Sequence, residues 1–96
     1  MNDDPIEIPI DGTLDLHAFH PRDVGELVAD YLSECRKRNI LDVRIIHGKG
    51  KGTLRETVHT VLDRLPEVSS YHIAGDRSGW GATLVTLRAR NEPDGR

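Results

Sequence analysis

The 96-residue sequence predicts an α/β protein, a two-layer sandwich in which two helices cover a four-stranded mixed sheet. Short apolar segments alternate with two stretches of helical periodicity, which gives the order strand, helix, strand, helix, strand, strand (βαβαββ). A chain of this length buries roughly two thirds of its unfolded surface, which suffices for one compact core. We therefore expect one domain over residues 13–90, preceded by an extended arm and followed by a flexible tail at 91–96.

The arm covers residues 1–12, where two prolines allow only an edge strand or an irregular extension. The first strand is expected at residues 13–17. Its leucines alternate with Asp15 and His17, so the two polar side chains face the side of the sheet opposite the leucines. They are either a catalytic pair for phosphodiester cleavage or an ordinary solvated strand face.

The first helix is expected to begin at Pro21 and to end at Asn39, a natural helix stop. Its apolar positions recur at helical spacing: Val24, Leu27, Val28, Tyr31, Leu32 and Cys35. A single cysteine excludes an internal disulfide, and its place on the apolar stripe predicts a buried thiol in a reducing compartment.

The second strand is expected at residues 42–47, and the second helix begins at Thr53. Thr53 and Glu56 have the spacing of a capping box, and Pro66 ends this helix. It is expected to bury Leu54, Val58, Val61, Leu62 and Leu65.

The last two strands, at residues 69–74 and 82–87, form a closing hairpin. The first three strands should run parallel and the fourth antiparallel to its neighbour. Right-handed crossovers then place both helices on one face, and ligands are expected at the carboxyl ends of the parallel strands, where His17 and His47 emerge.

The loop after the second strand is rich in glycine and lysine: His47, Gly48, Lys49, Gly50, Lys51, Gly52 and Thr53. Glycines let backbone N–H groups point outward together, and the following helix adds the positive end of its dipole. The loop therefore predicts a phosphate-binding site. His47 either contacts the phosphate or acts as an acid, or it satisfies a nearby carbonyl group.

Charge is unevenly distributed along the chain, whose net charge is −3. Residues 1–35 carry nine acids against one base, residues 36–55 seven bases against one acid, and residues 56–96 five bases against six acids. The basic block contains the glycine loop, which favours a polyanionic partner over an ordinary solvated surface.

Several classes of function are excluded. No apolar stretch is long enough to span a membrane and the first residues lack the order of a signal peptide, so we expect a cytoplasmic protein without a membrane partner. The glycine loop is too short for a Walker motif, and Thr53 stands where a dinucleotide fingerprint needs glycine. His59 and His72 have no evident partners, and no zinc-ligand spacing occurs.

Three segments in order resemble the Smr (small MutS-related) domain family: Leu14-Asp15-Leu16-His17, His47-Gly48-Lys49-Gly50 and Gly79-Trp80-Gly81-Ala82-Thr83-Leu84-Val85. The resemblance covers residues 14–87. It implies a fold similar to the C-terminal domain of translation initiation factor three, together with nucleic-acid binding and, in several members, nicking of DNA or cleavage of RNA. One departure is Ala18, where the family usually has glycine, whose backbone is less restricted.

The resemblance places Asp15 and His17 on the strand motif implicated in activity, and His47, Gly48 and Gly50 on the binding loop. With His47 as a candidate acid, the expected catalytic set is Asp15, His17 and His47. The expected nucleic-acid contacts are His47, Gly48, Lys49, Gly50, Lys51, Gly52, Arg55, Arg77, Gly79, Trp80 and Gly81. Trp80 either stacks on a base or closes one end of the core. Asp15 and His17 would position a water molecule or a divalent metal, magnesium or manganese, although no metal cluster is evident.

We thus expect a nucleic-acid-binding protein, and as an enzyme a structure-selective endonuclease acting on DNA or RNA phosphodiesters. The alternative is a non-catalytic adaptor that binds RNA or the ribosome. A site for a phosphorylated metabolite is a third possibility, but it would need a closed pocket. Nothing in the sequence indicates the oligomeric state.

Overall fold

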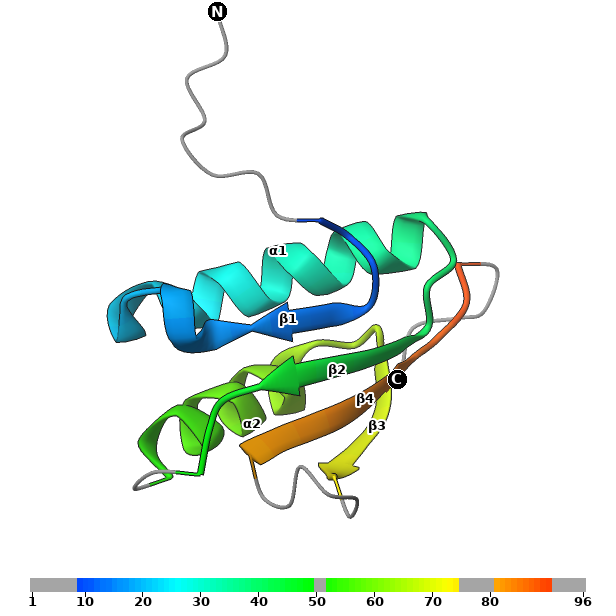
Figure 1. Cartoon of the computed structure of the whole chain (residues 1–96). Coiled ribbons are helices and arrows are strands. Elements are labelled where there is room, and N and C mark those ends of the chain that lie inside the picture. The colour runs from blue at the N-terminus through cyan, green and yellow to red at the C-terminus, as the bar shows by residue number, and fades with distance from the viewer. Residues whose placement is uncertain (1–8, 50–51, 75–80, 91–96) are drawn as a thin grey trace, which may run out of the picture.

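The protein is described by a computed structural model that covers residues 9–49, 52–74 and 81–90 (Figure 1). Its elements have the predicted order: β1 (Thr13–Asp15), two short 3-10 helices, η1 (Leu16–Ala18) and η2 (Pro21–Asp23), then α1 (Val24–Lys37), β2 (Asp42–Ile46), α2 (Thr53–Arg64), β3 (Val68–Ile73) and β4 (Ala82–Leu87). The predicted α/β class, with four strands and two helices, is confirmed.

The four strands form one sheet in the order β1-β2-β4-β3. β1 pairs parallel to β2, and β4 is antiparallel to both β2 and β3. The first three strands therefore point the same way, as predicted, but only β1 and β2 are parallel neighbours because β4 lies between β2 and β3. β4 is also the most apolar of the strands, with four of its six residues buried, which suits a central position.

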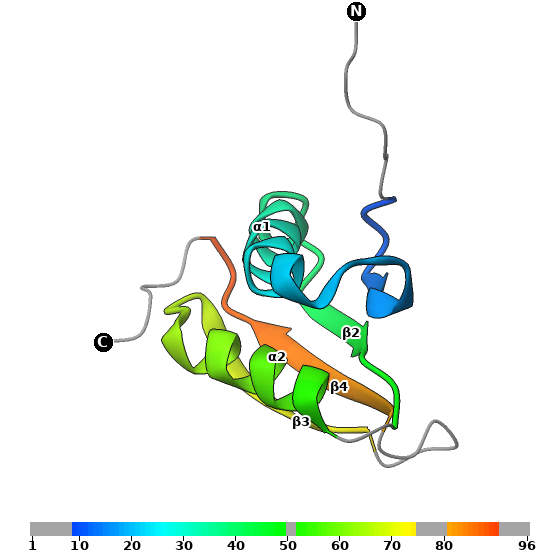
Figure 2. The same ribbon diagram turned by 90° about the vertical axis from the view of Figure 1, so that its left-hand side faces the viewer.

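Both helices pack on one face of the sheet (Figure 2). The core between the layers consists of inward side chains of β1, β2 and β4 and of one stripe from each helix: Leu14, Val43, Ile45, Val85, Leu87, Val28, Leu32, Cys35, Val58 and Leu62. Cys35 is fully buried, as predicted, and burial raises the pKa of its thiol. The predicted two-layer sandwich is confirmed.

The end of β1 differs from the predicted one for a local reason. β1 ends at Asp15 rather than at residue 17, because the Asp15 carboxylate accepts a hydrogen bond from the His17 backbone N–H and starts the 3-10 turn η1. The C-terminal end of α1 agrees with the prediction: Asn39, which follows the helix, lies in the left-handed region at φ 62°.

The predicted capping box of α2 is wrong. The residue that caps the helix is Gly52, at φ 87°, and Thr53 is the first helical residue. The left-handed conformation at position 52 suits glycine and ends the loop one residue earlier than a threonine cap would. The carbonyl oxygen of Thr53 accepts a hydrogen bond from the Thr57 hydroxyl instead.

Within residues 9–49, 52–74 and 81–90, neither helix combines the length and apolar character that crossing a bilayer requires.

Candidate functional site

The carboxyl ends of β1 and β2 lie side by side, since Asp15 pairs with Ile46 in the parallel register. The turn after β1 and the loop after β2 therefore leave the sheet at the same edge, as predicted. We call this edge the rim and define it as residues 15–17, 47–49, 52–55 and 81.

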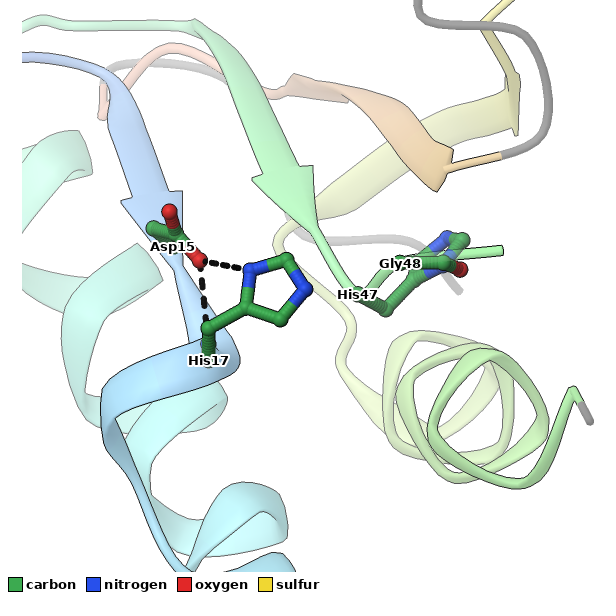
Figure 3. A network of polar contacts seen from close by, with 4 residues as sticks. All are labelled: Asp15, His17, His47 and Gly48. Atoms are coloured by element: carbon green, nitrogen blue, oxygen red, sulfur yellow. Dashed lines mark hydrogen bonds and ion pairs between the residues drawn. The ribbon is translucent and has the colours of Figure 1, made fainter. Parts of the chain in front are cut away.

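Asp15 and His17 form a close pair at the rim (Figure 3). The Asp15 Oδ1 atom accepts hydrogen bonds from the His17 backbone N–H at 2.9 Å and from its ring Nδ1 at 2.7 Å. The backbone hydrogen bond is the main cause that lowers the pKa of Asp15, and the His17 ring adds to it. An ionised carboxylate fixes the proton on Nδ1, so neutral His17 presents the lone pair of Nε2.

The His17 ring points across the rim toward Gly48 (Figure 3). A Cβ atom at Gly48 would lie 3.0 Å from His17 Nε2, and Gly48 has a φ of 84°. Both the backbone conformation and the space favour glycine at this position. His17 and Asp15 themselves are open to solvent, with side-chain exposures of 63% and 58%.

Ala18 stands in the 3-10 turn η1 with no left-handed backbone. Among the described residues other than glycine, only Asn39 has a positive φ. The turn that carries His17 therefore accommodates alanine in place of the glycine usual in the family.

The backbone N–H of Gly48 does not point outward, contrary to the prediction for the glycine loop. The N–H groups of His47 and Gly48 both donate to the carbonyl oxygen of Gly81 at 2.9 Å. These bonds tie the start of the loop to the start of β4, because Gly81 directly precedes that strand. Gly48 thus shapes the rim and its N–H is already used.

His47 is buried, with 5% of its surface exposed, and both ring nitrogens have partners. Nδ1 lies 3.0 Å from the Gly48 carbonyl oxygen, and Nε2 lies 2.8 Å from the Thr83 hydroxyl. Burial is the main cause that lowers the pKa of His47. The geometry supports the second interpretation of this residue, a histidine that satisfies a nearby carbonyl, because both ring nitrogens are engaged by protein atoms.

Sequence reasoning missed two members of this network. His59 of α2 places its Nε2 2.8 Å from the same Thr83 hydroxyl, although the sequence offered no partner for it. Thr83 belongs to the third segment that resembles the Smr family, but the sequence pattern indicated no function for it. No spacing rule joins residues 47, 59 and 83, because the sheet and α2 bring them together.

Positive charge at the rim comes from two described residues. Lys49 is exposed, and Arg55 folds back along α2, where a methyl group on Gly52 would lie 2.6 Å from its Nη2 atom. Arg55 thus holds its guanidinium over the first turn of α2, whose dipole also favours anions.

The basic block of residues 36–55 does not form one surface. Arg36, Lys37 and Arg38 lie at the C-terminal end of α1, at the opposite end of the sheet from the rim (Figure 1). Lys37 and Arg38 pair with Glu34 at 3.3 and 3.9 Å, and Arg36 donates to backbone carbonyls that follow β4. These three bases stabilise the fold locally and do not add to the rim.

Several predicted contacts lie outside the described residues: Gly50, Lys51, Arg77, Gly79 and Trp80. The predicted arm and tail are likewise outside them, except for residues 9–12.

The described side chains do not form a metal cage. Within residues 9–49, 52–74 and 81–90 no three His, Cys, Asp or Glu side chains converge. The rim offers one carboxylate and one exposed imidazole, since His47 is buried with both ring nitrogens engaged, and Asp15 already uses Oδ1 for His17. This donor set does not fit a magnesium or manganese ion held by protein ligands alone.

A hollow of about 430 Å³ lies at the other end of β1 and β2, on the helix-free face. Its lining includes the acidic side chains of Asp11 and Asp42 together with Arg44 and His72. It is separate from the rim.

Comparison with known proteins points to one family. The Smr domain family matches residues 14–88. Endonuclease MutS2 of Halothermothrix orenii is 36% identical over 78 residues, which is 80% of this chain and 10% of that protein. Endonuclease MutS2 of Solidesulfovibrio magneticus is 48% identical over 65 residues, or 67% of this chain and 8% of that protein. The chain therefore spans about a tenth of the length of these relatives.

Solved structures agree with this result. The Smr domain of Thermus thermophilus MutS2 superposes with a TM-score of 0.75 at 32% identity, covering 81% of this chain and 99% of that domain. YdaL, a stand-alone small MutS-related protein from Escherichia coli, gives a TM-score of 0.74 at 26% identity, covering 80% of this chain and 64% of that one. The sequence match and the shared fold together show that the chain belongs to the Smr domain family.

Proposed function

We propose that this Smr domain binds nucleic-acid phosphates at the rim and nicks phosphodiester bonds with Asp15 and His17. One observation carries the proposal: the 2.7 Å contact between Asp15 and His17, with Nε2 directed toward Gly48 beside Lys49 and Arg55. A fixed carboxylate and imidazole next to positive charge is the arrangement that general acid–base cleavage of a phosphodiester requires. The relatives from H. orenii and S. magneticus, both named endonucleases, support the same chemistry.

The chemistry follows from the tautomer that Asp15 imposes. His17 Nε2 takes the proton of the attacking water or ribose hydroxyl, whose oxygen forms a bond to phosphorus. The bond from phosphorus to the leaving oxygen breaks, and that oxygen gains a proton from solvent. Asp15 stabilises the imidazolium formed at His17, while Lys49 and Arg55 offset the charge on the phosphate.

A cleavage panel tests the proposal. Purified protein is incubated with branched DNA, single-stranded DNA and structured RNA, each with magnesium, with manganese and with a chelator. We expect cleavage of at least one substrate by the wild type. The double variant Asp15→Ala with His17→Ala should lose at least about 100-fold in rate, since general acid–base catalysis typically contributes 10²–10⁴-fold.

His72→Gln serves as the matched control, because it removes an exposed imidazole from β3. Cleavage that survives the double substitution would remove Asp15 and His17 from the mechanism. Absence of cleavage of every substrate would reduce the proposal to binding. A rate that persists in chelator would show that the pair acts without a divalent ion.

A non-catalytic adaptor for RNA or the ribosome is the second candidate. It is favoured by the openness of the pair, since more than half of each side chain is exposed and no third acidic or histidine side chain joins it among the described residues. Co-sedimentation with ribosomes in the absence of any cleavage would select this function. Loss of co-sedimentation with Arg55→Gln would then place the contact at the rim.

A further inference from the structure

The buried histidines behind the rim form a directed chain of hydrogen bonds. The carbonyl oxygen of Gly48 can only accept, so its 3.0 Å contact with His47 Nδ1 is a hydrogen bond only when the proton of His47 is on Nδ1. Burial lowers the pKa of His47, and the neutral ring then has a lone pair on Nε2. The Thr83 hydroxyl must donate its only hydrogen to that atom.

The chain of hydrogen bonds continues from Thr83 to His59 of α2. Since the hydrogen of Thr83 is used by His47, the Thr83 oxygen accepts from His59, whose proton is therefore on Nε2. The His59 ring stacks at a tilt on Tyr71, with centroids 4.8 Å apart, and the Tyr71 hydroxyl donates to Asp63 at 2.6 Å. Side chains from α2, β3 and β4 thus hold one defined tautomer of His47.

These bonds fix the backbone of Gly48 on both sides of its Cα atom. Its carbonyl oxygen accepts from His47, and its N–H donates to Gly81. The same glycine faces Nε2 of His17 across the rim. The gap between His17 and the loop, where a phosphate would sit, is therefore set by groups that lie behind it.

We propose that Thr83 and His59 are positioning residues for the rim: they select the Nδ1–H tautomer of His47, which holds the Gly48 carbonyl and so sets the distance between the loop and His17. This inference rests on the proposed function for its effect on cleavage or binding. The tautomers themselves are defined in the free protein.

Long-range proton–nitrogen NMR at pH 7.5, without nucleic acid, tests the arrangement directly. We expect His47 as the Nδ1–H tautomer and His59 as the Nε2–H tautomer. A protonated His47, or His47 in the Nε2–H form, would overturn the proposal. No substitution is needed, so this test does not depend on whether a variant folds.

Substitutions test the effect on the rim. Thr83→Val has nearly the same shape but no hydroxyl, and Thr83→Ser retains it. We expect the valine variant to lose the single His47 tautomer and about tenfold in cleavage rate or oligonucleotide affinity, the factor that one lost hydrogen bond of about 1.4 kcal/mol gives. The serine variant should keep both, as should Thr86→Val, which removes an exposed hydroxyl from the same strand.

Activities are compared at a temperature at which each variant is folded, as measured by circular dichroism. If Thr83→Val does not fold, His59→Gln replaces it, because the glutamine amide can donate to Thr83 and should retain most of the function, whereas His59→Leu should not. Equal activity of folded Thr83→Val and wild type would overturn the positioning role.

The two proposals fail separately. The expected tautomers in a protein that neither binds nor cleaves nucleic acid would refute the proposed function alone. A wild type that cleaves or binds, with His47 in the other tautomer, would refute only the inference drawn from Thr83 and His59.

Discussion

At the scale of single residues, Asp15 shows how one side chain sets both local structure and chemistry. Its Oδ1 atom ends β1 by accepting the His17 N–H and orients the His17 ring by accepting Nδ1. The sequence predicted that Asp15 and His17 lie together at the rim. It did not predict the 3-10 turn, because strand alternation alone would have placed the pair side by side rather than in contact.

Asp15→Asn should separate these two roles. Asparagine keeps an acceptor oxygen for the His17 N–H, so the free energy of unfolding should change by less than about 0.5 kcal/mol. The loss of negative charge removes the partner of the imidazolium, and the cleavage rate should fall by about 100-fold. Chemical denaturation and a cleavage assay measure the two effects.

Asp11→Asn is the matched control, because Asp11 caps the other end of β1 by accepting the Thr13 N–H at 3.0 Å. It should leave the cleavage rate unchanged. An equal loss of rate in both variants would mean that Asp15 acts through general charge rather than through His17.

Gly48→Ala should damage the rim through the backbone and the space at once. The left-handed conformation costs an alanine roughly 1–2 kcal/mol, and its methyl group would displace the His17 ring. We expect a lower unfolding midpoint in denaturant together with lost cleavage or binding.

Gly25→Ala is the comparison variant, for which we expect the opposite effect on stability. Gly25 lies in α1, and its added methyl group would meet Val61 at an ordinary 3.6 Å. This variant should be more stable than the wild type by about 0.5–1 kcal/mol. A Gly48→Ala protein as stable and as active as the wild type would show that the left-handed glycine is not required.

At the scale of elements, the loop and the first turn of α2 form the positively charged side of the rim. The sequence predicted the helix, its glycine-rich approach and the nearness of Arg55. It could not predict that the Gly48 N–H is used by Gly81, because that bond depends on β4 lying next to β2. Nor could it predict the separation of Arg36, Lys37 and Arg38 from the loop. These bases belong to the same basic block of the sequence as the loop, but β2 lies between them and spans the length of the sheet.

Arg55→Gln should reduce the salt dependence of nucleic-acid binding. If Arg55 contacts one phosphate, the slope of log K against log salt concentration should become less steep by about 0.7–0.9. Fluorescence anisotropy with a labelled oligonucleotide at several salt concentrations measures it. Arg64→Gln, at the far end of the same helix, is the control and should leave the slope unchanged.

At the scale of the whole molecule, the sheet and α2 meet at the buried network of His47, Thr83 and His59. The sequence predicted the class, the order of elements and the shared face of the helices from periodicity alone. It did not predict the position of β4 or the partner of His59, because both depend on pairing between segments far apart in the chain.

This network makes stability depend on pH. Burial lowers the pKa of both His47 and His59 in the folded protein, protonation of His47 would lower that of His59 further, and the Arg55 guanidinium lowers both. Below about pH 6.5 the unfolded chain therefore binds protons that the folded chain resists, so the free energy of unfolding falls as pH falls from 7 to 5. Each group contributes at most about 1.4 kcal/mol per pH unit.

Denaturation at a series of pH values measures this slope. His59→Gln should make it shallower, and His72→Gln is the control for loss of one imidazole. Asp15, whose pKa is lowered, stays ionised in this window and does not add to the slope. A slope unaffected by His59→Gln would contradict a neutral, buried His59.

The central place of β4 has a consequence for biosynthesis. Of the four strands, β4 is the last to leave the ribosome, and it joins β2 to β3 with five aligned residue pairs on each side. Until Leu87 has emerged, the nascent polypeptide holds the β1–β2 pair and β3 with no strand to join them, so folding of this domain must await synthesis of β4. A stop codon introduced before Ala82 should therefore yield a product that proteases degrade rather than a smaller working domain.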